Sequence, residues 1–269
     1  MSLAVHDLTI DIGGRRVVDG VSFAVPDGAR VGLIGESGSG KSLTALAILG
    51  LLPDAATVGG RILWDDQDLR DLDDRALARL RGRDIGMVFQ EPQTALNPVR
   101  RVGRQMIESL RIHDGMSRAD AAGRAIELAE RMALPDPARI VRRYPHQLSG
   151  GQRQRVALAA ALASAPRLVI ADEPTTALDV TVQAGILTLL RDLVEDEGRG
   201  LLFITHDLAV LSLIATHGVV LHRGRVVEDA PVQTLLTAPS SEITRGLLRD
   251  ARATSWVPPA STRPDEEPR

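Results

Sequence analysis

The 269-residue sequence contains no cysteine, and only 2% of its residues are aromatic. The absence of cysteine excludes disulfides and any thiolate-ligated zinc or iron–sulfur site. No apolar run reaches the roughly 18 residues of a membrane-spanning helix, and the N-terminus lacks the charged-then-apolar pattern of a signal peptide. A formal net charge of −3 gives no electrostatic reason to expect nucleic-acid binding. With 44% hydrophobic residues, this composition predicts a globular chain that stays in the cytosol.

Lysine is almost absent as well, because only one of the 32 basic residues is a lysine, Lys41. It lies in a run that fits G-x-x-x-x-G-K-[ST] and consists of Gly35, Glu36, Ser37, Gly38, Ser39, Gly40, Lys41 and Ser42. Small residues let successive backbone N–H groups converge on a phosphate, and a following helix directs its positive end at the anion. We expect Lys41 to bridge the β- and γ-phosphates of a nucleotide. The Ser42 hydroxyl is a candidate Mg²⁺ ligand.

The surroundings of this run distinguish a phosphate loop from a glycine-rich turn that binds nothing. Residues 30–35 before it are apolar and strand-like, and residues 42–52 after it follow a helical pattern that Gly50 and Pro53 end. Strand, loop and helix therefore occur in the order that phosphate binding requires.

The rest of the chain predicts an α/β core interrupted by a helical insertion. Alternation over 8–12 and 21–25, around Gly13–Gly14, predicts an antiparallel sheet. Further strand patterns cover 61–64, 85–89, 168–172, 201–205 and 219–222. We expect a β subdomain and first part of the core in 1–93, a helical subdomain in 94–145, the second part of the core in 146–230, a helical extension in 231–252 and a disordered tail in 253–269.

Two adjacent carboxylates follow the apolar strand at 168–172. Because successive side chains of a strand point to opposite sides, Asp172 and Glu173 cannot share a role. Asp172 is the natural partner of Mg²⁺, and Glu173 is placed to polarise a water for attack on the γ-phosphate. The alternative is a solvated acidic turn, but a buried strand rarely ends on paired acids without a cation nearby.

A second glycine-containing segment precedes a helical pattern at 149–164. Its residues are Leu148, Ser149, Gly150, Gly151 and Gln152. Ser149 is a good N-cap, and the two glycines leave the first N–H groups of the helix open to an anion. The segment is either a capped helix with a flexible entry or a second phosphate site, which could serve the same nucleotide only across a dimer interface.

Taken together, these motifs resemble those of ATP-binding subunits of ABC transporters over residues 1 to about 250. The residues that carry the resemblance are Gly35–Ser42, Gln90, Leu148–Gln152, Asp172–Glu173, Asp179 and His206. The resemblance implies a P-loop NTPase fold with an N-terminal antiparallel β subdomain and an inserted helical subdomain. It also implies ATP and Mg²⁺ as cofactors, with Ser42, Gln90 and Asp172 around the metal.

The same resemblance assigns roles to the remaining residues. Each ATP is expected between the phosphate loop of one subunit and Ser149–Gly151 of a second ATPase subunit, in a homo- or heterodimer. Glu173, His206 and Gln90 are the expected catalytic residues, with His206 at the γ-phosphate. Asp179 is expected to communicate with the opposite site. Gln90 is expected to connect the metal and the attacking water to a membrane partner.

Longer stretches are similar to dipeptide, oligopeptide and nickel importer ATPases, namely Phe89–Pro98, Tyr144–Val156 and Asp172–Gln183. This similarity implies two transmembrane permeases, an extracytoplasmic solute-binding protein, a peripheral place on the cytoplasmic membrane face and no nucleic acid. Ile12 stands where the family usually has an adenine-stacking aromatic residue, which predicts weaker base binding.

Alternatives remain at the level of function. The leading function is an ATPase that energises an importer of di- or oligopeptides. Ser241–Thr244 replaces a common His-Pro-Tyr-Thr segment. A cysteine-bearing C-terminal extension is also missing, which tilts slightly toward shorter relatives such as the nickel-type subunit and makes nickel uptake the alternative. A soluble ABC ATPase that acts on ribosomes or DNA would need two nucleotide domains or a long coiled-coil insertion. An exporter ATPase disagrees with the segments around Gln90 and Asp179. The transported solute itself is not readable from this subunit.

Overall fold

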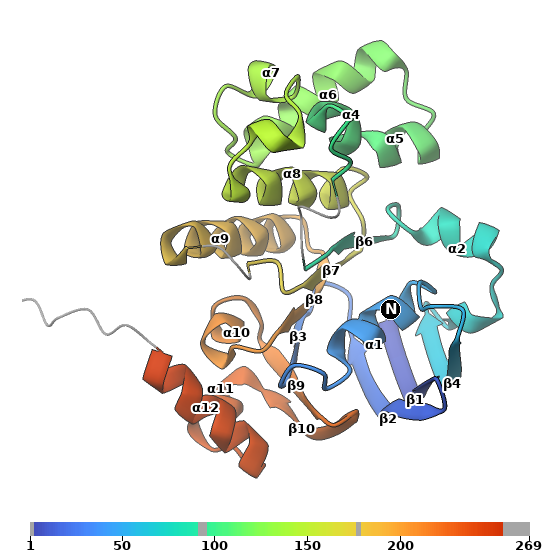
Figure 1. Ribbon diagram of the computed structural model, residues 1–269, viewed down its shortest axis with the longest axis vertical. Coiled ribbons are helices and arrows are strands. Elements are labelled where there is room, and N and C mark those ends of the chain that lie inside the picture. The colour runs from blue at the N-terminus through green and yellow to red at the C-terminus, as the bar shows by residue number, and fades with distance from the viewer. Residues whose placement is uncertain (1–2, 91–95, 176–178, 255–269) are drawn as a thin grey trace, which may run out of the picture.

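A computed structural model describes residues 3–90, 96–175 and 179–254 of the chain and contains two β-sheets with helices around them (Figure 1). The four-stranded sheet has the order β2-β1-β4-β5 and is antiparallel. Its strands are β1 (Leu3–Ile12), β2 (Arg15–Val25), β4 (Ala56–Trp64) and β5 (Gln67–Asp68). The turn between β1 and β2 uses Gly13 and Gly14 at φ 57° and 77°, a backbone conformation that suits glycine. The predicted N-terminal antiparallel sheet is confirmed.

The six-stranded sheet has the order β10-β9-β3-β8-β7-β6. Its strands are β3 (Arg30–Ile34), β6 (Ile85–Val88), β7 (Leu168–Asp172), β8 (Gly200–Thr205), β9 (His217–His222) and β10 (Arg225–Pro231). All neighbours pair in parallel except β9 and β10. Strands β7 and β8 are buried along their whole length, as expected for central strands of a parallel sheet covered on both faces.

Helices cover this sheet and form a separate lobe. They are α1 (Lys41–Ile48), α2 (Asp74–Leu80), α4 (Val102–Met106), α5 (Glu108–His113), α6 (Arg118–Arg131), α7 (Pro137–Ile140), α8 (Gly150–Leu162), α9 (Val180–Asp196), α10 (Leu208–Ile214), α11 (Val232–Thr237) and α12 (Glu242–Thr254), with single 3₁₀ turns at Leu69–Asp71 and Pro145–Gln147. Figure 1 shows α4 to α7 as a lobe at the top of the molecule, above α8 and α9. This is the helical insertion that the sequence predicted.

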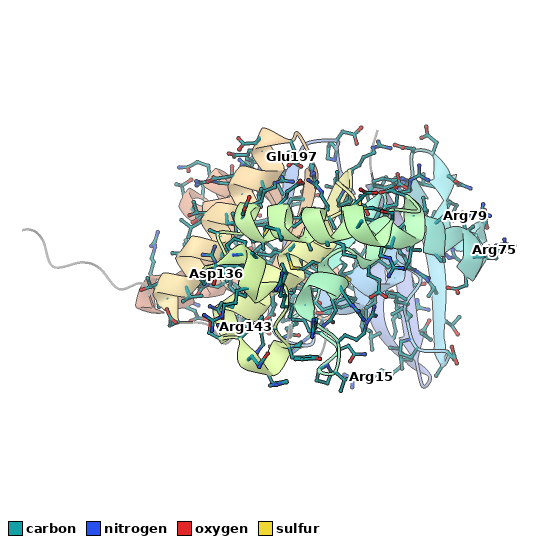
Figure 2. The ribbon with its side chains drawn as sticks, turned by 90° about the horizontal axis from the view of Figure 1, so that it is seen from above. Arg15, Arg75, Arg79, Asp136, Arg143 and Glu197 are labelled. Atoms are coloured by element: carbon teal, nitrogen blue, oxygen red, sulfur yellow. The ribbon has the colours of Figure 1, made fainter. Side chains whose placement is uncertain are left out.

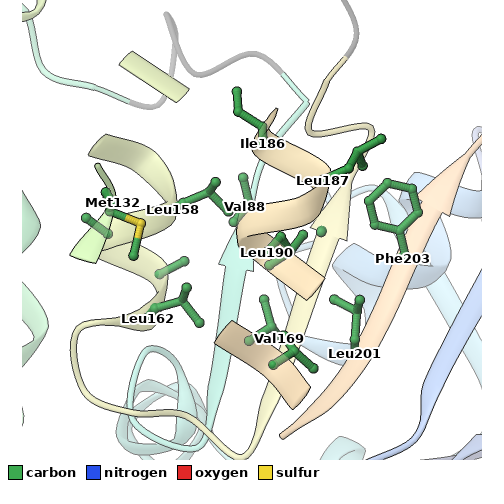
Figure 3. Close-up of a cluster of buried hydrophobic side chains, with 14 of the residues drawn as sticks. Val88, Met132, Leu158, Leu162, Val169, Ile186, Leu187, Leu190, Leu201 and Phe203 are labelled. Carbon is green, nitrogen blue, oxygen red and sulfur yellow. The ribbon is translucent and has the colours of Figure 1, made fainter. Parts of the chain in front are cut away.

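Two apolar clusters lie on the two faces of the six-stranded sheet. Val169 and Phe203 point into the cluster beneath α8 and α9, whereas Ile170 and Ile204 point into the cluster shared with α1 and the antiparallel sheet. The alternation follows from the two-residue period of a strand. Figure 3 shows Phe203 beside Leu187 in the first of these clusters. The central strands of the six-stranded sheet are therefore packed on both faces.

Boundaries differ from the sequence expectation at some positions. Helix α12 runs to Thr254, two residues into the segment expected to be disordered, and the rest of that segment lies outside the described residues. The start of the predicted helical subdomain at Thr94 also lies outside them. Helix α1 ends at Ile48, earlier than the pattern through Leu52 suggests, because Gly50 adopts a φ of 61°. Among the described helices, none has both the length and the apolar character to cross a membrane.

The buried core predicts a contrast between two phenylalanines. Phe203 is fully buried, whereas Phe89 is 40% exposed. Phe203→Ala leaves a cavity and should lower the free energy of unfolding by about 3–5 kcal/mol, and Phe89→Ala by about 1 kcal/mol. Urea denaturation of the isolated chain, followed by far-UV circular dichroism, measures both. Equal losses in the two variants would contradict the assignment of Phe203 to the core.

Candidate nucleotide-binding and hydrolytic site

The predicted phosphate loop connects the end of β3 to the start of α1. Gly40 is the N-cap of α1 with φ 102° and provides no side-chain cap, so the first N–H groups of the helix remain available to an anion. A Cβ at Gly35 would lie 2.1 Å from the Leu221 carbonyl oxygen, and one at Gly40 would lie 2.9 Å from Val18 Cγ2. Glycine is therefore required at both positions by close approach of other strands.

Lys41 is held in the centre of this loop. Its Nζ donates to the carbonyl oxygens of Gly35 at 2.7 Å and Glu36 at 2.9 Å, and the residue is 5% exposed. Burial lowers the pKa of the Lys41 ammonium, while the charges of Glu173 and Asp172 act in the opposite direction. A buried ammonium inside a ring of backbone groups has few partners and a strong attraction for phosphate oxygens.

Asp172 ends β7 beside the first turn of α1. Its Oδ1 accepts a hydrogen bond from Ser42 Oγ at 3.1 Å, and the residue is 5% exposed. Burial raises the pKa of the Asp172 carboxyl, and the hydrogen bond from Ser42 partly opposes this shift. The structure thus brings together the two oxygen-bearing side chains for which the sequence predicted a shared metal.

Glu173 lies one residue beyond β7, between two other predicted site residues. Gln90 Nε2 donates to its Oε2 at 3.4 Å, and His206 Nδ1 lies 3.2 Å from its Oε1. Only 10% of the Glu173 side chain is exposed, against 52% of His206. The carboxylate is therefore positioned by groups on both of its oxygens at the margin of the core.

Separate roles for the two acids were predicted from strand alternation, but the structure shows a different cause. β7 ends at Asp172, and Glu173 adopts the left-handed backbone conformation with φ 43°. Its N–H still donates to the Ile204 carbonyl oxygen at 2.9 Å. A non-glycine residue in this conformation is strained and is commonly found at functional sites. The turn, and not the pleat, directs Glu173 to its own partners.

The segment Leu148–Gln152 lies elsewhere in the molecule. Ser149 Oγ accepts from the Gln152 N–H at 3.3 Å, and Gln152 Oε1 accepts from the Ser149 N–H at 3.1 Å, which forms a capping box at the start of α8. A Cβ at Gly151 would lie 2.7 Å from Val182 Cγ1 of α9. Within the described part of the chain, no hydrogen bond joins this segment to the phosphate loop, and Figure 1 shows α8 well separated from α1.

Asp179 has a local structural role in this chain. Its side chain accepts from the Val182 N–H at 2.9 Å and caps α9. It is exposed and followed by Val180, which is 81% exposed, so this helix start faces away from the core of its own chain.

Sequence reasoning missed the contribution of the β9–β10 hairpin. His222, at the end of β9, has its Nδ1 3.7 Å from Glu36 Oε2, and the Gly224 N–H donates to the Ser39 carbonyl oxygen at 3.1 Å. The predicted strand at 219–222 offered a signal, because parallel pairing with β3 places its end beside the phosphate loop. Ile12, at the expected base-stacking position, is partly buried against the apolar cluster of the antiparallel sheet.

Comparisons with known proteins identify the family of this chain. The family profile described as ABC transporter matches residues 18–176. The chain is 46% identical over 252 residues to a probable peptide ABC transporter ATP-binding protein, y4tR, of Sinorhizobium fredii, covering 91% of this chain and 75% of the relative. It is 49% identical over 241 residues to a putative peptide import ATP-binding protein of Brucella melitensis, covering 86% and 71%.

Two further similarities concern a longer relative and a solved structure. The peptidoglycan transport ATP-binding protein YejF of Agrobacterium fabrum is 48% identical over 252 residues, and the match spans 91% of this chain but 46% of the relative. The dimeric ATP-binding cassette MJ0796, bound to ADP and Pi in a post-hydrolysis state, superposes with a TM-score of 0.76 at 32% identity, covering 86% of this chain and 98% of that one. The chain therefore belongs to the ABC transporter family, as one of its ATP-hydrolysing subunits.

Proposed function

We propose that this chain hydrolyses Mg²⁺–ATP within a dimer of ATPase subunits to energise the import of di- or oligopeptides through a membrane permease. The observation that carries the proposal is the meeting of the phosphate loop, Asp172, Glu173, Gln90 and His206 at one edge of the six-stranded sheet. The buried Ser39 hydroxyl, which lacks a hydrogen-bond partner among the described residues, adds an unsatisfied group inside the loop.

Ser42 and Asp172 fit the requirements of a magnesium site. Their side-chain oxygens are 3.1 Å apart. Asp172 is buried, and burial raises the pKa of its carboxyl because water no longer stabilises the charged form. Mg²⁺ prefers such oxygen ligands and would supply charge neutralisation at the phosphates. Among the described residues, no group of three or more His, Asp or Glu side chains could hold a metal ion by itself. Water and phosphate oxygens would therefore complete the coordination. Gln90, whose amide donates to Glu173, is proposed to lie beside the metal and the attacking water.

Glu173 is the proposed general base. Its two oxygens contact Gln90 and His206, so the carboxylate is oriented before a water arrives, and it stands outside the strand that Asp172 ends. Orientation of a base by its neighbours is the requirement for water activation in this kind of phosphoryl transfer. His206, half exposed at the start of the loop after β8, is proposed to contact the γ-phosphate.

The proposed dimer follows from the distance between the phosphate loop and the start of α8 within one chain. The N–H groups at the start of α8 belong to a helix remote from α1, and Asp179 and Val180 are exposed at the start of α9. A second copy or a related subunit would bring Ser149–Gly151 and Asp179 to the opposite nucleotide. The dimeric state of the similar MJ0796 cassette supports this arrangement.

Peptides are the favoured cargo, on the basis of the relatives. The similar proteins of Sinorhizobium and Brucella are named for peptides, and this favours peptide over nickel uptake. Action on ribosomes or DNA gains no support from these names. Permease subunits, an extracytoplasmic binding protein and a peripheral place at the cytoplasmic membrane face belong to the same proposal.

The proposed base is tested by Glu173→Gln. An amide cannot take a proton from water, so we expect hydrolysis to fall about 100-fold or more while ATP binding persists and the nucleotide-bound dimer accumulates. Glu242→Gln, the same change at an exposed carboxylate of α12, should keep activity within a few fold. Phosphate-release kinetics and size-exclusion chromatography with ATP measure both. Hydrolysis at the parental rate in Glu173→Gln would refute the assignment.

The lone lysine is tested by Lys41→Arg. A planar guanidinium is larger than an ammonium and cannot sit between the Gly35 and Glu36 carbonyls as a point charge. We expect the Kd for Mg²⁺–ATP to rise at least about tenfold in titration calorimetry. Arg79→Lys on the exposed face of α2 serves as the control and should bind like the parent. Parental affinity in Lys41→Arg would show that the loop does not need a compact cation.

Docking of the permease is proposed for the segment after Gln90. We expect the loop 91–98, which follows Gln90, to receive a short cytoplasmic helix of the permease. Residues 91–95 lie outside the described residues, but Asn97, Pro98 and Val99 are exposed, Val99 at 80%. Val99→Cys in this cysteine-free chain should crosslink to a cytoplasmic loop of the permease in the assembled transporter. Leu213→Cys on α10, 56% exposed, is the matched control. Crosslinking at position 213 but not at position 99 would place the coupling surface elsewhere.

A further inference from the structure

Arg81 contacts both the phosphate-binding helix α1 and the helical lobe. It ends α2 and begins the short turn that leads into β6. Its guanidinium donates to the carbonyl oxygens of Leu49 at 2.7 Å and Gly50 at 3.1 Å, just beyond the last residue of α1. Its own carbonyl oxygen lies 2.9 Å from Nε2 of His113 on α5. In Figure 1, α2 lies between α1 and α5, which agrees with these contacts.

The contact with α1 occupies the whole guanidinium. A helix leaves its last carbonyl groups without intrahelical donors, and a cation is favoured there by the helix dipole. Nη1 of Arg81 also donates to Asp74 Oδ1 at 2.7 Å, so Nε, Nη1 and Nη2 each have a partner. A Cβ at Gly50 would lie 2.6 Å from Leu77 Cδ1 and 3.3 Å from Arg81 Nη2. The planar fork is therefore held closely against the end of α1.

The turn at Arg81 and Gly82 fits one face of α5. Ser109 and His113 are four residues apart and lie on the same side of that helix. A Cβ at Gly82, whose φ is 80°, would lie 3.5 Å from Ser109 Cβ and 3.7 Å from His113 Nε2. Because a carbonyl oxygen only accepts, Nε2 of His113 must carry the hydrogen that it shares with Arg81. Protonation of His113 at Nδ1 would leave this hydrogen bond in place.

Helix α1 connects this contact to the phosphate loop. Lys41 and Ser42 form its first turn, and Leu49 caps its other end, about 12 Å away for eight residues at 1.5 Å each. Thr44 and Ile48 are buried, so the helix is packed along its length. A loop that closes on phosphate moves the start of α1, and the end that Arg81 holds moves with it.

A second attachment of the lobe lies elsewhere. Arg131 of α6 pairs with Glu197, which follows α9. In Figure 2, Arg79, two residues before Arg81, lies at the edge of the molecule and well apart from Glu197. A rigid body that is held at two separate points turns about one of them when the other is displaced. Displacement of Arg81 would therefore rotate the lobe about its attachment at Glu197.

We propose that Arg81 and His113 are positioning residues that transmit nucleotide occupancy at the phosphate loop to the helical lobe. The fork of Arg81 follows the end of α1, and the hydrogen bond from His113 carries the displacement into α5. The inference rests on the proposed function, because it requires a nucleotide at the loop. It adds a connection that does not pass through the segment after Gln90.

The test removes the hydrogen-bond donor on α5. His113→Leu keeps most of the side-chain volume and loses the donor, whereas His113→Gln keeps an N–H donor at a similar reach. The matched control is His6→Leu, the same change at an exposed histidine of β1. A second control, Ser109→Ala, lies on the same face of α5 as His113. Its buried hydroxyl lacks a hydrogen-bond partner among the described residues, so its removal should leave the connection intact.

The position of the lobe is measured as the distance between two spin labels in the full-length chain, which has no native cysteine. Glu130→Cys on α6 and Leu213→Cys on α10 carry the labels, because both positions are exposed. Labelled chains are diluted with unlabelled ones, so that distances within one chain dominate. Spectra are recorded without nucleotide and with saturating Mg²⁺–AMP-PNP, a non-hydrolysable analogue of ATP.

The parent should show a shift of the mean distance when the analogue binds. His113→Leu should lose at least about half of that shift, because the lobe no longer follows α1. His113→Gln, His6→Leu and Ser109→Ala should keep it. The thermal midpoint of His113→Leu should stay within about 4 °C of the parent, since one partly buried hydrogen bond is lost.

Several results would overturn the inference and leave the ATPase assignment intact. One is a full shift in His113→Leu, another is a lost shift in His113→Gln, and a third is a parent that binds the analogue without any shift. A larger fall of the thermal midpoint in His113→Leu would show that the contact serves stability alone, and this would overturn the inference as well. A parent that binds no Mg²⁺–AMP-PNP would instead refute the proposed function.

Discussion

Four neighbouring parallel strands end at one edge of the six-stranded sheet, and the register of their hydrogen bonds decides which side chains meet there. Ile34 pairs with Thr205, Asp172 with Ile204, and Val88 with Ala171, so the strands stop within about one residue of each other. The groups that follow these strands must converge on one region. Every feature of the site depends on this register.

The convergence has an electrostatic cost that a nucleotide would offset. Lys41 and Asp172 are both 5% exposed. Burial lowers the pKa of Lys41 and raises the pKa of Asp172, so it favours the neutral form of each side chain. Buried charges are stable only when paired or bound to a counter-ion. A ligand with negative oxygens, bound together with a cation, would offset both costs, and this is the chemistry of Mg²⁺–ATP in the proposed function.

The helical lobe extends this site to a second surface. Arg131 of α6 pairs with Glu197 after α9, and Arg155 of α8 donates to the Met132 carbonyl oxygen at 2.7 Å. These contacts join the lobe to the core. A lobe attached in this way can transmit a change at the γ-phosphate as a rigid-body rotation.

Much of the fold and of the candidate site could be predicted from local sequence. The phosphate loop needed only its glycines and Lys41, the cap of α8 needed only Ser149 and Gln152, and the apolar runs at 168–172 and 201–205 predicted buried strands. Each of these features depends on neighbours within a few residues, so propensity and spacing suffice to predict it. The family resemblance extended these local readings to Gln90 and His206.

Other features were decided by tertiary structure. The left-handed turn at Glu173 arises where β7 meets the Ile204 carbonyl of the neighbouring strand, and the link from Gly224 to Ser39 joins residues 185 positions apart. Local sequence determined which groups are present, because secondary structure has short periods. Their meeting was decided by strand order and helix packing, which depend on contacts between distant parts of the chain.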